Sequence, residues 1–186
     1  MRSIWLVFTG LLGALGLGYH LSQPPAPAAL TQRAAAGAAG PSAPTAPRPG
    51  PAPTRADSLV RFALAQQGTA YCYAGTSPRT GFDCSGFVQY VFGHFGVATP
   101  HSTALLIGVG RPVARAQAQP GDLVVFAGTA PGSTTPGHAG IVISALGEVP
   151  LRFVHASSAR RASGVKVSAV EGSGYETRFL GVRRVL

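Results

Sequence analysis

Cys84 stands at a position where a protein backbone can activate a thiol. The apolar residues that follow it recur with the period of an α-helix; they are Phe87, Val88, Val91, Phe92 and Phe95. The thiol therefore lies at the start of the predicted helix, where unpaired N–H groups and the positive end of the helix dipole stabilise a thiolate. We expect its pKa to lie below the value of about 8.5 of a free cysteine. The alternative is a buried cysteine that packs as a small apolar side chain.

Two histidines downstream can supply the other groups that a nucleophilic thiol needs. His138 opens an apolar run rich in β-branched residues, and His155 closes another short apolar run, so both are expected on strands. Two adjacent antiparallel strands would bring both imidazoles beside the helix of Cys84. Because a thiol needs a base, and the base needs a third group to orient it, these three residues can form a catalytic set.

The remaining histidines are weaker candidates. His94 lies almost three turns away from Cys84 on the same predicted helix, so it is expected to be a surface or boundary residue. His101 follows that helix, and His20 belongs to an apolar N-terminal segment. His101 therefore stays a weaker candidate, and His20 is set aside.

The second cysteine, Cys72, lies twelve positions before Cys84. Two cysteines in an exported protein suggest a disulfide, but a permanent bridge would consume the nucleophile, so we expect both thiols to be free. A transient oxidised form stays open as a minor alternative. The spacing of the cysteines and histidines matches no common zinc motif, so no metal site is predicted.

Four segments, read in order, resemble motifs of the NlpC/P60 family of cysteine peptidases. Residues 71–88 (YCYAGTSPRTGFDCSGFV) resemble the opening of the family domain, and residues 120–126 (PGDLVVF) resemble its next strand. Residues 138–143 (HAGIVI) and 153–157 (FVHAS) are similar to the two strands that carry the family's histidines. The closing strand at 181–185 is also similar, so the resemblance covers about residues 57–186.

The resemblance assigns roles to the candidate residues. It implies that Cys84 is the nucleophile, that His138 is the general base, and that His155 orients that base. Tyr71 matches the tyrosine that the family places near the nucleophile, where its hydroxyl can help to hold an oxyanion. A packing role for the Tyr71 ring is an equal alternative.

The residues on either side of the nucleophile are also candidates. Ser85 could form part of the substrate pocket, while the backbone N–H of Cys84 is the natural first donor to an oxyanion. For Asp83 we favour a structural role, in which its carboxylate caps the start of the helix.

Two departures from the family pattern bear on substrate preference. The paired glycines that follow the family's tyrosine read Ala74-Gly75 here, which leaves one less unrestricted backbone position. The family's Leu-Pro-Arg segment reads Thr99-Pro100-His101. Because that segment commonly lines the family's substrate cleft, the preferred substrate stays open.

The N-terminal part predicts export. Arg2 precedes an uncharged apolar run at residues 4–19, as in a signal peptide, and we favour a cleaved signal at 1–22 over a membrane anchor. Residues 23–54 are rich in alanine, proline and glycine and carry only two charges, so they are predicted to be a disordered linker. This linker is either a tether or a tail without a role.

Residues 55–186 are predicted to form one α+β domain, because helices come first and strands follow. Helices are expected from about Asp57 to Gln67, after Cys84, and near Ser102. Five strands are expected at 123–126, 139–144, 152–156, 165–170 and 179–185. The resemblance implies the same architecture: a papain-like core with N-terminal helices packed on one antiparallel sheet.

The function implied by the resemblance is an exported cysteine hydrolase that cuts amide bonds in peptidoglycan stem peptides. The favoured bond joins D-glutamate, through its side-chain carboxyl, to a diamino acid. The location implied is the periplasm, the cell envelope or the exterior, with membrane association if the N-terminal segment is retained. We expect a monomer that needs no cofactor.

The charge balance fits this environment. The chain has 15 basic and 6 acidic residues, for a net charge of +9, which favours weak attraction to an acidic wall polymer. Scattered arginines and export argue against nucleic-acid binding. Three alternative functions stay open: an amidase that cuts between muramic acid and L-alanine, an acyltransferase that uses the same thioester, and a non-catalytic wall-binding module.

Overall fold

The computed structural model describes residues 52–186. The predicted signal peptide or anchor at 1–22 lies outside the described residues, as does the predicted linker at 23–54 apart from its last three residues. All helices and strands of the described part lie within the predicted domain at 55–186. None of these helices is long and apolar enough to cross a membrane.

Three α-helices precede most of the strands. Helix α1 (Arg55–Leu64) begins with a capping box, in which Thr54 and Asp57 each accept a hydrogen bond from the backbone N–H of the other. Helix α2 (Cys84–His94) begins at the candidate nucleophile, and the short helix α3 (Thr103–Leu106) follows it. All three lie where the sequence predicts them, although α1 ends three residues early because the chain turns before Gly68.

The main sheet has six strands, all paired antiparallel, in the order β3-β8-β4-β5-β6-β7. Strands β4 to β7 form a meander, and β8 returns beside β4. A separate two-stranded hairpin, β1 and β2, precedes α2. The bounds are Thr76–Ser77 (β1), Gly81–Phe82 (β2), Arg111–Val113 (β3), Leu123–Ala127 (β4), Pro136–Val142 (β5), Arg152–Ser157 (β6), Gly164–Ala169 (β7) and Phe179–Arg184 (β8).

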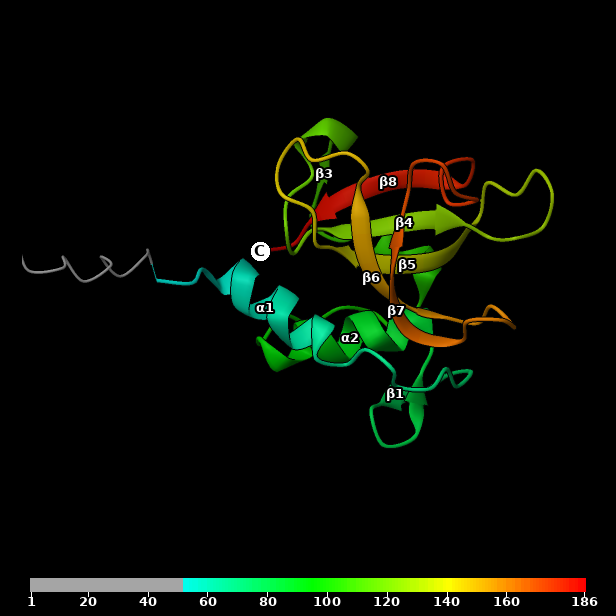
Figure 1. The fold of residues 1–186 in the computed structure, drawn as a ribbon, viewed down its shortest axis with the longest axis horizontal. Helices are drawn as coiled ribbons and strands as arrows, with labels where there is room; N and C mark the ends of the chain where they lie inside the picture. The colour runs from blue at the N-terminus through cyan, green and yellow to red at the C-terminus, as the bar shows by residue number, and fades with distance from the viewer. Residues whose placement is uncertain (1–51) are drawn as a thin grey trace, which may run out of the picture. The chain divides into compact units, whose positions relative to one another are not determined.

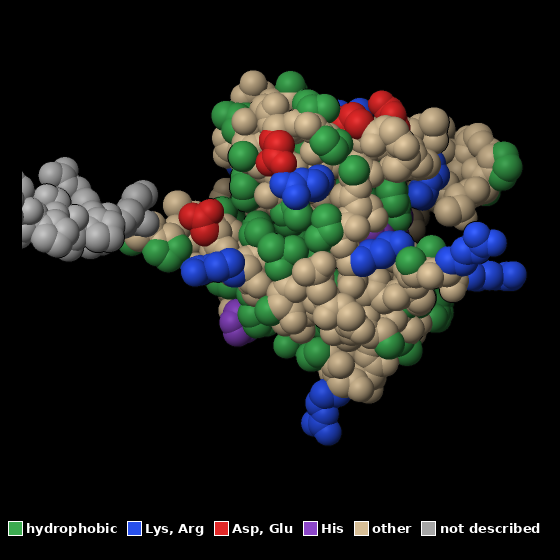
Figure 2. All heavy atoms as spheres, viewed as in Figure 1, with side chains coloured by type: hydrophobic (Ala, Val, Ile, Leu, Met, Phe, Trp, Pro, Cys, Tyr) green, Lys and Arg blue, Asp and Glu red, His purple; other side chains and the backbone are tan. Residues whose placement is uncertain are grey.

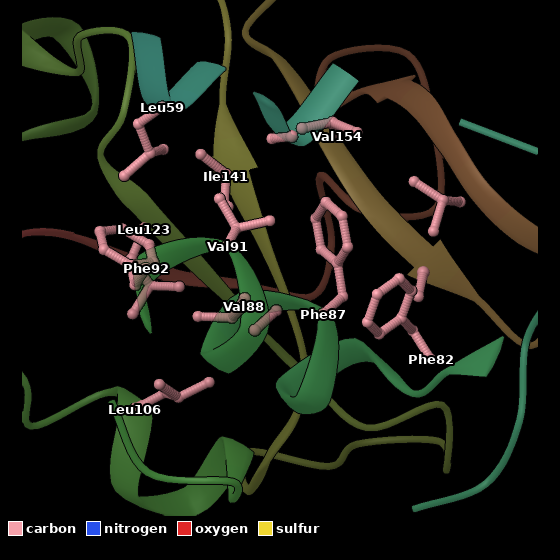
Figure 3. Close-up of a cluster of buried hydrophobic side chains, with 14 of the residues drawn as sticks. Leu59, Phe82, Phe87, Val88, Val91, Phe92, Leu106, Leu123, Ile141 and Val154 are labelled. Atoms are coloured by element: carbon pink, nitrogen blue, oxygen red, sulfur yellow. The ribbon is translucent and has the colours of Figure 1, made fainter. Parts of the chain in front are cut away.

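The helices cover one face of this sheet (Figure 1). Side chains from α1 and α2 meet alternate residues of β4, β5 and β6 in a buried cluster (Figure 3), which we call the helix-side core. Its members are Leu59, Ala63, Phe82, Phe87, Val88, Val91, Phe92, Leu106, Leu123, Val125, Ala139, Ile141, Val154, Ala156 and Val165. Because this cluster locks α2 against β5, it determines where Cys84 lies relative to the sheet.

The opposite face of the sheet carries a second buried cluster, which we call the outer core. It contains Ala118, Val124, Phe126, Val142, Leu151, Phe153, Val170 and Val182. Successive side chains of a strand point to opposite faces, so His155 shares the face of Phe153, and His138 shares the face of Val142. Both histidines therefore belong to the outer face of strands whose other face packs on the helices.

The predicted α+β fold, with helices packed on one antiparallel sheet, is confirmed. The five predicted strands are present, but the sheet has a sixth, β3, which the sequence analysis missed. Strand β3 is a three-residue edge strand that contains Pro112 and is mostly exposed, so it lacks the apolar alternation that reveals a longer strand.

Candidate active site

Cys84 is the first residue of α2 and borders a pocket of about 440 Å³. The carboxylate of Asp83 accepts a hydrogen bond from the backbone N–H of Gly86 at 2.6 Å, which confirms the predicted capping role. The thiol is free and half-buried, so it opens on to the pocket without being surrounded by solvent. The pocket is lined by Tyr71, Tyr73, Ala74, Asp83, Cys84, Ser85, His101, Ser102, Thr103 and Gly137.

The pKa of the Cys84 thiol is raised above its ordinary value, so the prediction of a lowered pKa was wrong. Burial is the largest cause, and the nearby carboxylate of Asp83 adds to it. Hydrogen bonds from the backbone N–H groups of Ala139, Ser85 and Cys84 act in the opposite direction. Because the loss of water around the sulfur outweighs these donors, the resting thiol is protonated at neutral pH and a base must remove its proton.

Two histidines and a serine form a chain of hydrogen bonds. Nε2 of His138 lies 2.8 Å from Nδ1 of His155, and Nε2 of His155 lies 2.9 Å from Oγ of Ser168. A neutral imidazole has one donor and one acceptor nitrogen. We assign the Nε2 protons so that His138 donates to His155 and His155 donates to Ser168. Nδ1 of His138 is then left as a proton acceptor.

Local backbone geometry brings the part of β5 that carries His138 close to the thiol. His138 pairs with Phe126 of β4, and the register of the two strands shifts just after Phe126; such a bulge redirects side chains at the end of a strand. A Cβ at Gly140 would lie 2.6 Å from the ring of Phe153, so only glycine permits this approach of β5 to β6. The residue after His138 is Ala139, whose N–H reaches the sulfur of Cys84.

Burial keeps both imidazoles neutral. It lowers the pKa of His138 to about 4, and the positive charges of Arg178 and Lys166 add to this effect. Burial also lowers the pKa of His155 to about 2, with smaller contributions from His138, Lys166 and Arg178. At neutral pH the pair is therefore in the form that can accept a proton.

We expect the free energy of unfolding to fall as the pH drops from about 6.5 to about 4. His138 has a pKa of about 4 in the folded protein and 6.5 ordinarily, so between these values the unfolded chain binds the proton and the folded protein does not. The stabilisation is complete above the ordinary value and is lost as the pH falls to about 4. The loss from His138 alone is roughly 3 kcal/mol.

Urea unfolding at pH 4.5 and pH 7 measures this difference. The His138→Gln variant cannot take up that proton, so its stability should change less between the two pH values. An equal change in the two proteins would contradict a buried neutral His138.

Two further predicted residues line the same pocket. The pKa of Tyr71 is raised by burial and then by the nearby Cys84 thiol, so its hydroxyl keeps a proton that it can donate. Ser85 is buried, and its hydroxyl donates to Oδ1 of Asp83 at 3.1 Å. That proton is therefore used to hold Asp83.

The structure gives His101 a larger part than the sequence predicts. Its Nε2 lies 2.9 and 3.0 Å from the two carboxylate oxygens of Asp83, and its ring forms part of the pocket wall. His94, in contrast, is exposed and stacks on Phe62, as expected for a boundary residue. The thiol of Cys72 is free, as predicted.

The sequence analysis missed three residues of this site. Ser168 lies on β7, which the sequence analysis predicted as the strand at 165–170 and which pairs with the strand of His155. A polar residue on that strand was a usable signal. Tyr175 and Arg178 lie in the connection between β7 and β8, which has no periodic pattern, so nothing in the sequence pointed to them.

Known proteins resemble this chain in both sequence and structure. A family model described as the NlpC/P60 family matches residues 68–184. A probable endopeptidase of Mycobacterium tuberculosis is 43% identical over 86 residues, which are 46% of this chain and 20% of that protein. A gamma-DL-glutamyl hydrolase of Bacillus subtilis is 37% identical over 134 residues, which are 71% of this chain and 30% of that protein. The matches thus span less than a third of the length of these two relatives.

Solved structures extend the comparison from sequence to fold. The crystal structure of an NlpC/P60 family protein from Bacillus cereus superposes with a TM-score of 0.61 at 29% identity, over 74% of this chain and 41% of that one. The family model also covers both the segment that carries Cys84 and the strands that carry His138 and His155. The chain therefore belongs to the NlpC/P60 family.

Proposed function

We propose that this protein is an exported cysteine endopeptidase that hydrolyses peptidoglycan stem peptides. Its proposed target is the amide bond between the side-chain carboxyl of D-glutamate and a diamino acid. One observation carries the proposal: the hydrogen-bond chain from Ser168 through His155 to His138 leaves a neutral ring nitrogen free to act as a base, and the backbone N–H of the next residue, Ala139, donates to the sulfur of Cys84.

In the first half of the reaction, Nδ1 of His138 takes the proton of the Cys84 thiol while the sulfur attacks the amide carbonyl. Because the resting thiol is protonated, attack and proton transfer are coupled. The oxyanion that forms accepts hydrogen bonds from the Tyr71 hydroxyl and from the backbone N–H of Cys84, which lies in the first helical turn and turns from the sulfur to the new acceptor.

Collapse of the tetrahedral intermediate breaks the carbon–nitrogen bond. The imidazolium of His138 protonates the departing amine and returns to its neutral form, leaving a thioester on Cys84. Water then attacks the thioester with His138 as base, and the thiol leaves with the proton. His155 and Ser168 keep the ring of His138 oriented in both halves.

Two kinds of observation support the substrate class. The two relatives named above are a probable endopeptidase and a gamma-DL-glutamyl hydrolase. The net charge of +9 suits an anionic polymer. On the face shown in Figure 2, lysine and arginine side chains are spread singly or in small groups and form no continuous basic patch. This dispersal fits weak attraction to a polymer better than a dedicated nucleic-acid groove.

Digestion of defined muropeptides with the purified protein, followed by mass spectrometry, tests the proposal. The expected products are a peptide that ends in D-glutamate and a fragment that begins with the diamino acid. Release of intact stem peptides would instead indicate an amidase that cuts next to muramic acid. Products that appear only with an added amine would indicate an acyltransferase, and binding without cleavage would indicate a wall-binding module.

The proposed location follows from the sequence alone. The apolar segment at 1–22 would direct export, and the Ala/Pro/Gly-rich segment at 23–54 would let the enzyme domain reach the wall. Membrane association requires that the segment at 1–22 is retained. Fractionation of cells that express the full chain, with N-terminal sequencing of the product, tests both points.

We expect His101→Ala to lower kcat/KM by about tenfold, because a misplaced pocket wall disturbs substrate positioning. The His101–Asp83 pair is partly exposed, so its loss should change the free energy of unfolding by no more than about 1 kcal/mol. Steady-state kinetics and thermal unfolding measure the two effects.

The matched control is Arg152→Ala, which removes an ion pair with Glu148 away from the pocket. Its kcat/KM should stay at the wild-type value. Unchanged kinetics in His101→Ala, or the same loss in both variants, would exclude a role for His101 in the pocket.

A further inference from the structure

The connection between β7 and β8 places an aromatic ring against the imidazole pair. The ring centroid of Tyr175 lies 5.5 Å from that of His138 and 5.4 Å from that of His155. The same ring contacts Phe126 and Phe153 at centroid distances of 4.9 and 5.0 Å. Tyr175 thus extends the outer core over both imidazoles and limits the access of water to them.

Arg178 also contacts this ring. Its guanidinium carbon lies 4.7 Å from the centroid of Tyr175, within cation–π distance. Nη1 of Arg178 donates to the carbonyl of Ala127 at 2.9 Å, and Nε donates to the carbonyl of Gly174 at 3.1 Å. The backbone N–H of Ala127 donates in turn to the carbonyl of Arg178 at 2.7 Å. Arg178 therefore ties the connection to the end of β4.

The connection is also braced internally. The hydroxyl of Ser173 donates to the carbonyls of Ala169 and Val170 at 2.7 and 2.9 Å, and its oxygen accepts the N–H of Tyr175 at 3.1 Å. These bonds fix the backbone that carries the ring. The backbone at Tyr175 is thus held in place by hydrogen bonds within the connection itself.

Several titratable or charged groups surround His138. They are His155 on β6, Lys166 on β7, and Tyr175 and Arg178 on the connection. The start of α2, with Cys84 and Asp83, approaches the neighbouring residue Ala139. Arg178 is the charged group with the largest effect on the pKa of His138, and it lowers it. It also keeps a fixed positive charge across the working pH range.

We propose that Tyr175 and Arg178 are positioning residues of the active site: the ring holds the imidazole pair and excludes water, and the guanidinium opposes a positive charge on the pair. This inference rests on the proposed function, in which His138 is the base. Its consequence is an enzyme whose base stays available in mildly acid surroundings, where an ordinary histidine would already be protonated.

Proton NMR titration of the histidine rings tests the electrostatic part without requiring activity. In the full chain with Cys84→Ala, His138 should titrate near pH 4. Adding Arg178→Gln should raise that midpoint by about one unit, because a nearby like charge is removed. Arg178→Lys keeps the charge and should keep the low midpoint.

The same titration distinguishes the effect of the Tyr175 ring on His138 from the effect of the Tyr175 hydroxyl. Tyr175→Leu opens the pair to water and should raise the midpoint of His138, while Tyr175→Phe keeps the ring and should leave the midpoint unchanged. An unchanged midpoint in Tyr175→Leu would overturn the role of the ring. This pair of variants also keeps the proposal testable if Arg178→Gln fails to fold.

Arg183→Gln is the matched control, because Arg183 also clasps two carbonyls, those of Val109 and Gly110, at 2.8 and 2.7 Å. It should lose hydrogen bonds but leave the midpoint of His138 unchanged. An equal shift in Arg178→Gln and Arg183→Gln, or no shift in Arg178→Gln, would overturn the proposal.

The pH profile of kcat/KM gives an independent readout in proteins that retain Cys84. The acid limb should move toward higher pH in Arg178→Gln and Tyr175→Leu, by the same amount as the NMR midpoint. If the wild-type protein cleaves no muropeptide, the proposed function fails while the NMR titration still decides the effect of the two residues on His138. If cleavage occurs but the limb stays in place, only the positioning proposal fails.

Discussion

Cys84→Ala is expected to abolish hydrolysis while the protein stays folded. The proposed reaction passes through a thioester on this sulfur, so kcat should fall by at least about 10⁴-fold, as when other covalent nucleophiles are removed. The start of α2 is capped by a bond from Gly86 to Asp83 that does not involve the sulfur. Muropeptide digestion and a thermal unfolding curve on the same sample measure the two effects.

Cys72→Ala is the matched control for this prediction. Cys72 is the other free thiol of the described residues. Its thiol makes one hydrogen bond, to the carbonyl of Tyr73 at 3.6 Å. It should retain activity within a few-fold of the wild type. Full activity in Cys84→Ala would refute the assignment of Cys84 as the nucleophile. An equal loss of activity in Cys72→Ala would show that the loss is not specific to Cys84.

Gly86→Ala is expected to damage both the fold and the chemistry. A Cβ at this position would lie 2.0 Å from the carbonyl oxygen of Gly75 and 3.0 Å from its carbon. Both atoms belong to the backbone, so no side-chain rotation removes the overlap. The same oxygen accepts the N–H of Asp83 at 3.0 Å, so the helix start must move away from the turn and break this bond.

Such a movement carries the thiol of Cys84 with it. Overpacking of this kind lowers the free energy of unfolding by about 1–3 kcal/mol, and a displacement of about 1 Å at the nucleophile lowers kcat/KM by about 100-fold. Urea unfolding and steady-state kinetics measure both losses.

Gly93→Ala provides the control on the same helix. Apart from the neighbouring backbone of α2 itself, no atom lies within 4 Å of a Cβ at Gly93, so alanine there should stabilise α2 by about 0.5–1 kcal/mol without changing the kinetics. If the two glycine variants show the same stability and kinetics, the close approach of Gly86 to Gly75 is not the reason that the first turn of α2 has a glycine at position 86.

The amino-acid sequence was enough to predict the scaffold of the site. Helical periodicity after Cys84 predicted α2 and its capping by Asp83, and apolar runs at His138 and His155 predicted the two neighbouring strands. These features are local, because a few consecutive residues determine the period and the cap. The order of the motifs predicted the family in the same way.

The ionisation of the site could not be predicted from the sequence. Helix position alone predicted a lowered pKa for Cys84, but burial and Asp83 raise it. Likewise, the low pKa of His138 comes first from burial and then from Arg178, forty residues along the chain. Desolvation depends on everything that packs around a group, and no local pattern encodes it.

The sequence by itself thus determined the helix that begins at Cys84, the strands that carry the two imidazoles and the family to which the chain belongs. Only the tertiary structure decided that Ser168 ends the hydrogen-bond chain, that His101 pairs with Asp83, and that Tyr175 and Arg178 enclose the imidazole pair. The physical reason is that helices, strands and caps arise from neighbours in the chain. Burial and long-range hydrogen bonds arise from segments that meet only when the sheet has formed.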